Sequence, residues 1–322
     1  MTRRIFMVPL VVLLEIAMLV TAPLSIGVAA IAGLVHRSSR PIRATALVLT
    51  YAAIELSTLA RIASGVDDWD ALERDVLDRG YRAMRRILDI PLELEPGSAT
   101  AGDLAASNGV IVLARHCGPG DSLFIAWLLA VPYALTMSIV LKDALRWEPT
   151  VNVAEDHLPL CFVRAGQGRG TAAVRSVAEQ LGPGRCLLLF PEGGNFSWER
   201  WRAAIRGFVE RREFAAARRA QRQTHTLPAR PGGALAALQA APHADVLLLA
   251  HSGFSTDGRD RPWWRVPMHR PLLVRTVLLP AHAVPRDEDG ARAFLDQAWE
   301  QIDTWVDGHA ALMELAERLE AG

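Results

Sequence analysis

The hydrophobic positions of this 322-residue chain follow two patterns, and the first is a long apolar N-terminal segment. Residues 5–35 are almost continuously apolar, with one acid and two prolines, and residues 44–63 form a second, more amphipathic segment. The first segment exceeds the roughly 20 residues that a membrane-spanning helix needs, and no small-residue cleavage site follows it. We therefore expect a two-helix membrane anchor hairpin over residues 1–64. The alternative is a buried helical hairpin of a soluble protein.

After residue 65 the pattern changes to short apolar runs that alternate with helical periodicity, as in α/β proteins. Strands are predicted at residues 109–115, 135–142, 158–164, 186–191, 245–252 and 271–279. Helices are predicted at residues 121–131, 171–181, 198–223, 233–241 and 287–319. We expect a single α/β domain over residues 65–322, built on a mixed sheet with flanking helices.

Composition and charge exclude some classes of function. A net charge of zero and 51% hydrophobic residues argue against disorder and against a general polyanion binder, so no nucleic-acid partner is expected. The three cysteines, Cys117, Cys161 and Cys186, are too widely spaced for a CxxC site and indicate a reduced, cytosol-facing protein. Lys142 is the single lysine among 35 basic residues. Either it is kept where a compact ammonium is needed in place of a guanidinium, or it remains by chance.

The segment RHCGPGDS, residues 115–122, places a histidine and an aspartate five positions apart. His116 is expected at the carboxyl end of a strand and Asp121 at the start of the next helix, the edge where open α/β sheets bind ligands. The Gly-Pro-Gly insert lets the backbone turn and bring the carboxylate to the imidazole. Such a carboxylate fixes the imidazole tautomer and leaves the other ring nitrogen free to take a proton from an alcohol. The alternatives are a structural histidine, or Cys117 as a covalent nucleophile.

The segment LLLFPEGGN, residues 187–195, also ends a predicted strand with a tight turn. Backbone amides freed at this turn can hold an oxyanion or a phosphate, and Glu192 can accept a hydrogen bond from a substrate hydroxyl. An ordinary strand-to-helix turn is the alternative.

An HxxxxD motif followed by FPEG resembles the glycerolipid acyltransferase family, the 1-acyl-sn-glycerol-3-phosphate acyltransferases and their relatives. The Lys-x-x-Leu at residues 142–145 and CFVRAGQGR at residues 161–169 match further family elements. ADVLLLAHS, residues 244–252, resembles the fourth, apolar motif of the family. HTLPARPGGALAAL, residues 225–238, resembles the segment that precedes this motif in the long-chain and lysocardiolipin-type branch, in a bacterial form. The resemblance covers roughly residues 80–285.

The resemblance implies an O-acyltransferase of phospholipid biosynthesis that moves a fatty acyl group from acyl-CoA or acyl carrier protein to the free hydroxyl of a lysophospholipid. The expected acceptor is 1-acyl-sn-glycerol-3-phosphate, which gives phosphatidic acid. The resemblance makes His116 the general base and Asp121 its orienting carboxylate. The residues expected to hold the acceptor are Lys142, Arg164, Glu192, Gly193 and Gly194. No metal or cofactor is expected. The partners are the thioester donor, the lysophospholipid and the membrane bilayer, and the catalytic domain, residues 65–322, is expected on the cytoplasmic side of the cell membrane.

The chain departs from the family pattern after FPEG, where Gly-Asn-Phe-Ser replaces the usual Thr-Arg-Ser. The missing arginine is expected to contact the acceptor phosphate. Lys142, Arg164, Arg169 or Arg200 can replace its charge, or the acceptor carries its phosphate as a diester or under a larger head group. The predicted helix over residues 198–223 has eight arginines and three glutamates, and it suits either anionic head groups or a solvated basic face.

Several other functions remain open. They are acyl transfer to a different lysophospholipid or glycolipid, acyl-CoA hydrolysis, and a non-catalytic lipid-binding relative. The sequence contains no GxSxG nucleophile elbow, the motif that would favour a hydrolase. From another class, a nucleotide-binding domain would use GQGRG, residues 166–170, with Glu192 as the ribose-binding acid, although the glycine spacing differs from GxGxxG.

Overall fold

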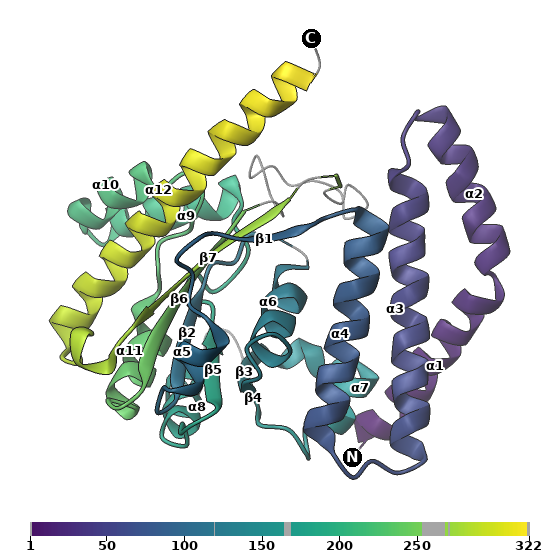
Figure 1. The fold of residues 1–322 in the computed structure, drawn as a ribbon, viewed down its shortest axis with the longest axis horizontal. Coiled ribbons are helices and arrows are strands. Elements are labelled where there is room, and N and C mark those ends of the chain that lie inside the picture. The colour runs from purple at the N-terminus through teal and green to yellow at the C-terminus, as the bar shows by residue number, and fades with distance from the viewer. Residues whose placement is uncertain (1, 119, 164–168, 253–267, 270, 321–322) are drawn as a thin grey trace.

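A computed structural model describes residues 2–118, 120–163, 169–252, 268–269 and 271–320. Within these residues a seven-stranded sheet has the strand order β1-β7-β6-β2-β5-β3-β4 (Figure 1). The strands are β1 (Leu92–Leu94), β2 (Val110–Ala114), β3 (Thr136–Lys142), β4 (Leu160–Val163), β5 (Arg185–Leu189), β6 (Asp245–His251) and β7 (Leu272–Leu279). Neighbouring strands are parallel except β6 and β7. The sheet is therefore mixed, and the six predicted strands are confirmed.

Helices cover both faces of the sheet, because the central strands are buried on both sides and need two hydrophobic cores. One core contains side chains of α4 (Trp69–Leu88) and α6 (Asp121–Ala130). The other contains side chains of α8 (Arg169–Ala178), α11 (Pro231–Ala240) and α12 (Glu288–Glu320). Strand β2 shows the alternation, since Val112 faces the first core and Ile111 and Leu113 face the second.

Some local elements differ from the sequence prediction. The helix expected over residues 198–223 is divided into α9 (Trp198–Glu210) and α10 (Phe214–Arg222). Arg212 has a φ of 60° between them, and the indole N–H of Trp201 donates to the carbonyl oxygens of Ala220 and Gln223, so the second helix folds back on the first. The elements that the prediction did not include are α4, α5 (Ala101–Ala105), α7 (Pro149–Ala154) and β1.

The N-terminal apolar segment forms three helices in place of the expected two. They are α1 (Thr2–Val20), α2 (Ala22–Val35) and α3 (Arg40–Ala63). The chain bends by 63° between α1 and α2. Pro23 lacks the N–H that would continue the hydrogen-bond ladder, and the Thr21 hydroxyl donates to the carbonyl oxygen of Ala17 at 2.7 Å. By length and composition, α3 could cross a membrane, and α1 with α2 could form one broken span.

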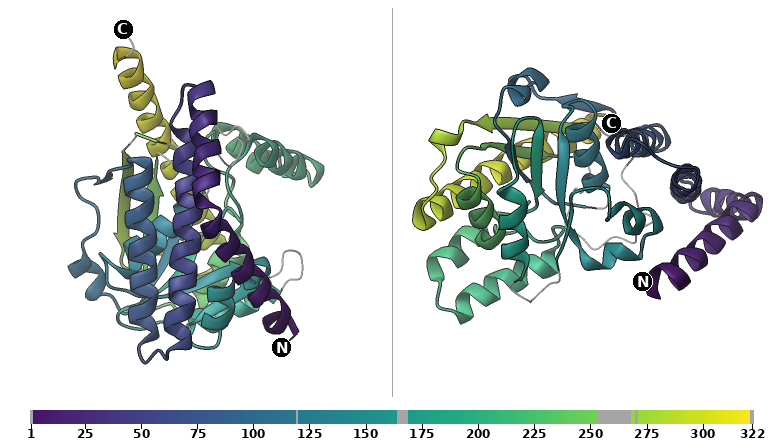
Figure 2. Two further views of the ribbon diagram at one scale, coloured as in Figure 1. Left: turned by 90° about the vertical axis from the view of Figure 1, so that its right-hand side faces the viewer. Right: turned by 90° about the horizontal axis from the view of Figure 1, so that it is seen from below.

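Helix α3 packs directly against the α/β domain. The guanidinium of Arg79 in α4 donates to the hydroxyls of Ser57 and Thr58, and the backbone N–H of Thr150 donates to the carboxylate of Glu55. Helices α1 and α2 lie on the outer side of α3, at the end of the molecule away from α11 and α12 (Figures 1 and 2). The proposed boundary at residues 64–65 therefore separates two elements that are in contact.

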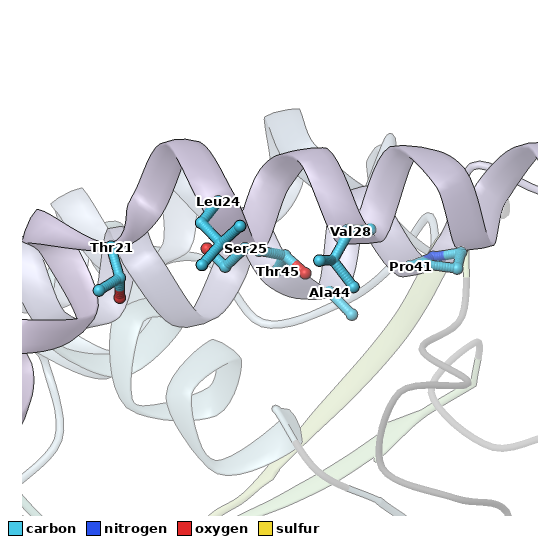
Figure 3. Close-up of a pocket in the computed structure, with 8 residues that line it drawn as sticks. Thr21, Leu24, Ser25, Val28, Pro41, Ala44 and Thr45 are labelled. Atoms are coloured by element: carbon cyan, nitrogen blue, oxygen red, sulfur yellow. The ribbon is translucent and has the colours of Figure 1, made fainter.

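Large exposed apolar side chains concentrate on α1 and α2. Leu13, Val20 and Leu34 are 63%, 74% and 79% exposed, and most of the other exposed leucines, isoleucines and valines of the described residues lie on the same two helices. A groove of about 410 Å³ between α2 and α3 is lined by apolar side chains with Thr21, Ser25 and Thr45 among them (Figure 3). An apolar surface of this extent is typical of a protein that contacts a membrane or a partner.

Candidate active site

Three ionisable residues lie at one edge of the sheet. His116 follows β2, Glu192 follows β5, and His251 ends β6. These three strands are neighbours and run parallel, so their carboxyl ends meet. This is the edge at which open α/β sheets bind ligands.

His116 and Asp121 form the pair that the sequence predicts. The Nδ1 atom of His116 lies 3.0 Å from Oδ2 of Asp121 and 3.1 Å from Oδ1. Because an ionised carboxylate only accepts hydrogen bonds, Nδ1 carries the proton and Nε2 is left as the basic nitrogen. The bend forms at Gly120, whose φ of 96° precedes the first residue of α6. The His116 side chain is 15% exposed, so the imidazole can be reached from solvent.

Asp121 is held in place by the loop that it closes. Its Oδ2 atom accepts the backbone N–H groups of Cys117 at 2.7 Å and Gly118 at 3.1 Å, and the Ser122 hydroxyl donates to Oδ1 at 3.3 Å. Burial alone would raise the pKa of Asp121, but the hydrogen bonds from His116 and Gly118 and the nearby imidazoles together lower it below its usual value. Asp121 is therefore a fixed, charged partner for the imidazole.

Glu192 is buried beneath the same loop. One carboxylate oxygen accepts the backbone N–H of His116 at 2.9 Å, and the other accepts the backbone N–H of Leu227 at 3.0 Å. Burial raises the pKa of Glu192 to about 8, although the Arg115 guanidinium and the two N–H groups oppose this shift. Glu192 thus ties three chain segments together. This geometry offers no oxygen that points freely at a substrate hydroxyl or a ribose.

Arg115 and His251 form a buried layer behind the pair. The Arg115 guanidinium donates to the carbonyl oxygens of His251 at 2.7 Å and His225 at 2.8 Å. The Nε2 atom of His251 lies 3.0 Å from the carbonyl oxygen of Arg115 and 4.0 Å from Oδ2 of Asp121. Burial lowers the pKa of His251 to about 4, so this imidazole is neutral near pH 7.

Cys117 is buried and its Sγ lies 3.8 Å from Nδ1 of His251. It therefore points away from the exposed edge of His116. Ligand atoms of Cys117, Asp121 and His251 lie within 4.8 Å of one another, a spacing that a metal ion can bridge. However, Oδ2 of Asp121 already accepts two backbone N–H groups, which compete with a metal for its lone pairs.

The structure places some of the predicted acceptor-binding residues and not others. Gly193 and Gly194 lie in the turn after β5, and the Gly193 N–H donates to the carbonyl oxygen of Phe190 at 2.9 Å. Lys142 is the last residue of β3, and its side chain lies outside the described part of the structure, as does the side chain of Arg169. Arg164 lies outside the described residues. The structure therefore brings together His116, Asp121, Glu192 and the two glycines.

Three residues that hold the backbone around the site were not singled out from the sequence: Arg115, His251 and Asp303. Asp303 in α12 accepts the backbone N–H groups of His225 and Thr226, both at 2.8 Å, and so orders the segment that Glu192 and Arg115 also bind. Arg115 and His251 could have been noticed because each lies at the carboxyl end of a predicted strand. Asp303 gives no such signal, because it lies in the middle of a long C-terminal helix.

Comparison with known proteins finds a similar family and a similar fold. Residues 99–247 match the family model described as Acyltransferase, a range that includes both motifs. These residues are therefore similar in sequence to that family. The fold is similar to the crystal structure of the 1-acyl-sn-glycerophosphate (LPA) acyltransferase PlsC from Thermotoga maritima. That comparison covers 83% of this chain and 97% of the other, with a TM-score of 0.53 and 15% identity, a level that shows the shared fold alone. No curated protein sequence matches the chain.

Proposed function

We propose that this protein transfers a fatty acyl group from a thioester, acyl-CoA or acyl carrier protein, to the free hydroxyl of a lysophospholipid. The observation that carries the proposal is the His116–Asp121 pair, with Nδ1 held by the carboxylate at 3.0 Å and Nε2 available at the exposed edge of the sheet. The match to the Acyltransferase family supports it. The favoured acceptor is 1-acyl-sn-glycerol-3-phosphate.

In this mechanism His116 acts as the general base. Nε2 takes the proton from the acceptor hydroxyl while the hydroxyl oxygen attacks the thioester carbonyl carbon. The tetrahedral intermediate collapses, the carbon–sulfur bond breaks, and the departing thiolate receives the proton from the imidazolium. Asp121 stabilises the imidazolium that forms between these two transfers. A thioester is already activated, so the protein needs to position the alcohol and accept its proton.

The N-terminal helices supply the proposed location. We place α1, α2 and α3 at a membrane, because their exposed leucines and valines are an unfavourable surface in water and a lysophospholipid acceptor resides in the bilayer. The α/β domain then lies on the cytoplasmic side. The bent α1–α2 pair can either lie in the interface or cross the bilayer as a broken span.

The test is release of coenzyme A from acyl-CoA over a panel of lysophospholipids, for the wild-type protein and His116→Ala. We expect acceptor-dependent release that falls by about 10²–10⁴-fold in the variant, the usual contribution of a general base. His282→Ala is the matched control, because this exposed histidine follows β7 at the opposite edge of the sheet and should leave the rate unchanged. Activity that survives His116→Ala would exclude the general-base role. Release of free fatty acid without any acceptor would identify a hydrolase.

A further inference from the structure

The peptide unit that precedes the Cα atom of His116 is held by two buried side chains. Its carbonyl oxygen, which belongs to Arg115, lies 3.0 Å from Nε2 of His251. Its N–H, which belongs to His116, donates to the Glu192 carboxylate at 2.9 Å. His251 is 0% exposed and Glu192 is 1% exposed, so water does not compete for either contact. Because a peptide unit is planar, its orientation sets φ of His116 and with it the direction of the imidazole.

The His251 imidazole contacts the residues on both sides of His116. Burial lowers the pKa of His251 to about 4, so near pH 7 the ring is neutral and has one N–H and one lone pair. Since a carbonyl oxygen only accepts hydrogen bonds, Nε2 carries the proton and donates to Arg115. Nδ1 faces the thiol of Cys117, with the sulfur atom at 3.8 Å. The Arg115 guanidinium in turn donates to the carbonyl oxygen of His251 at 2.7 Å, which fixes the backbone that carries the ring.

His251 also lies behind the carboxylate that orients His116. Its Nε2 atom is 4.0 Å from Oδ2 of Asp121, and its ring meets that of Phe124 in an edge-to-face contact with the centroids 5.8 Å apart. Both Asp121 and Phe124 belong to α6, so His251 fills the space between the end of β2 and the start of this helix. The His251 side chain has no exposed surface, whereas that of His116 is 15% exposed. His251 can therefore influence a bound substrate only through its neighbours.

We infer that His251 is a positioning residue, whose Nε2–H holds the Arg115–His116 peptide unit so that Nε2 of His116 points at the acceptor hydroxyl. This role rests on the proposed function, in which His116 removes the acceptor proton. A misplacement of about 1 Å at a reacting group can lower a rate by about 10²-fold, so a buried contact that orients the base affects the rate without touching substrate. Loss of the contact should therefore reduce kcat and leave KM unchanged.

Substitutions that keep one imidazole contact at a time test this role in the full chain in detergent. A glutamine can place its amide nitrogen near the position of Nε2 and still donate to Arg115, whereas an asparagine reaches only the position of Nδ1. Measured by release of coenzyme A, kcat of His251→Gln should stay within about threefold of the wild type, because the hydrogen bond is retained. His251→Asn should lose about 10- to 100-fold in kcat, with unchanged acceptor KM and donor KM.

Two further variants control for folding and for the loss of a histidine. His251→Phe keeps a ring in the buried space without the N–H, and it should lose kcat as His251→Asn does, so the test does not depend on the folding of one variant. Thermal unfolding identifies the variants that are folded at the assay temperature. His243→Asn is the matched control, because its Nε2 lies 3.1 Å from the carbonyl oxygen of Leu181 but it precedes β6, at the opposite edge of the sheet. It should leave kcat unchanged.

Equal kcat values in the glutamine variant and in the folded asparagine or phenylalanine variant would overturn the inference, as would an effect on KM alone. A readout without substrate separates this failure from a failure of the proposed function. It is the proton NMR signal of the His116 Nδ1–H group, assigned by its loss in His116→Ala. We expect this signal to be retained in His251→Gln and shifted or broadened in His251→Asn. If this order holds in a protein without acyl transfer, the proposed function fails and the positioning of His116 by His251 stands. Acyl transfer at equal rates in the two variants would remove the inference and leave the function intact.

Discussion

The loop after β2 and the turn after β5 each bury one carboxyl group, and the two groups differ in charge. Asp121 faces the His116 imidazole and two backbone N–H groups, and its pKa is lowered. Among the residues that the structure describes, Glu192 has two backbone N–H partners and no charged side chain hydrogen-bonded to it, and burial raises its pKa to about 8. The same type of group in neighbouring turns thus serves two purposes. In the proposed reaction Asp121 supports proton transfer by the imidazole, whereas Glu192 fixes the backbone of His116.

Of the substitutions that change one of these two carboxyl groups, Asp121→Asn should reduce activity the most. Asp121→Asn leaves one oxygen where two are needed, so the amide NH₂ faces either His116 Nδ1 or the N–H groups of Cys117 and Gly118. We expect kcat to fall by about 10³–10⁴-fold, because the carboxylate no longer fixes the imidazole tautomer or stabilises the imidazolium. Initial rates of coenzyme A release measure this effect. Ser122→Ala removes only the 3.3 Å contact to Oδ1 and is the control, with a loss of less than about threefold expected for one weak hydrogen bond. Equal losses in both variants would contradict the assignment.

Glu192→Gln should change stability and its dependence on pH. One of the two backbone N–H groups then faces an amide NH₂, which should cost about 1–3 kcal/mol of unfolding free energy. In the wild type, the folded chain holds the Glu192 proton up to about pH 8, while the unfolded chain releases it near the ordinary value. The stabilisation is therefore complete at low pH and is lost as the pH rises towards 8.

Thermal unfolding in detergent at pH 5, 6.5 and 8 tests this second prediction. The difference in stability between wild type and Glu192→Gln should shrink as the pH rises, because only the wild type loses the contribution. Differences that stay constant across this range would show that Glu192 is ionised throughout in the folded protein. Asp121→Asn should show the opposite trend with pH, since the lowered pKa of Asp121 makes its contribution fade as the pH falls.

The smallest expected effect is that of Cys117→Ala, which changes neither carboxylate. The backbone N–H that reaches Asp121 is retained, and the buried thiol that faces His251 is lost. We expect kcat within about threefold of wild type and a loss of about 1 kcal/mol in stability for a small buried side chain. Collapse of the rate to the level of His116→Ala would instead show that Cys117 carries the acyl group as a covalent intermediate.

The sequence determined the parts that depend on local pattern. Six of the strands follow from runs such as residues 109–115 and 245–252, because the central strands are covered on both faces and read as continuous apolar segments. The contact between His116 and Asp121 follows from HxxxxD, because the end of the strand and the start of the helix are five residues apart and the glycines permit the bend. The short strand β1 and the polar helix α4 were not predicted. Three residues are too few for a period to show. Helix α4 is strongly amphipathic and buries Tyr81, Met84 and Leu88 at helical spacing, so this periodicity was a signal that the prediction missed.

Tertiary structure decided everything that depends on residues distant in the chain. From FPEGG alone, Glu192 is predicted to bind substrate. Only the fold shows that the backbone N–H of Leu227, 35 positions later, donates to one of its carboxylate oxygens. The layer of Arg115, His251 and Asp303 joins β2, β6 and α12, which no spacing along the chain relates. The approach of the Arg230 guanidinium to Gly193, 37 positions earlier, likewise depends on the fold. Local sequence sets backbone conformation and periodicity, whereas the partners of buried polar groups are chosen by which strands become neighbours in the sheet.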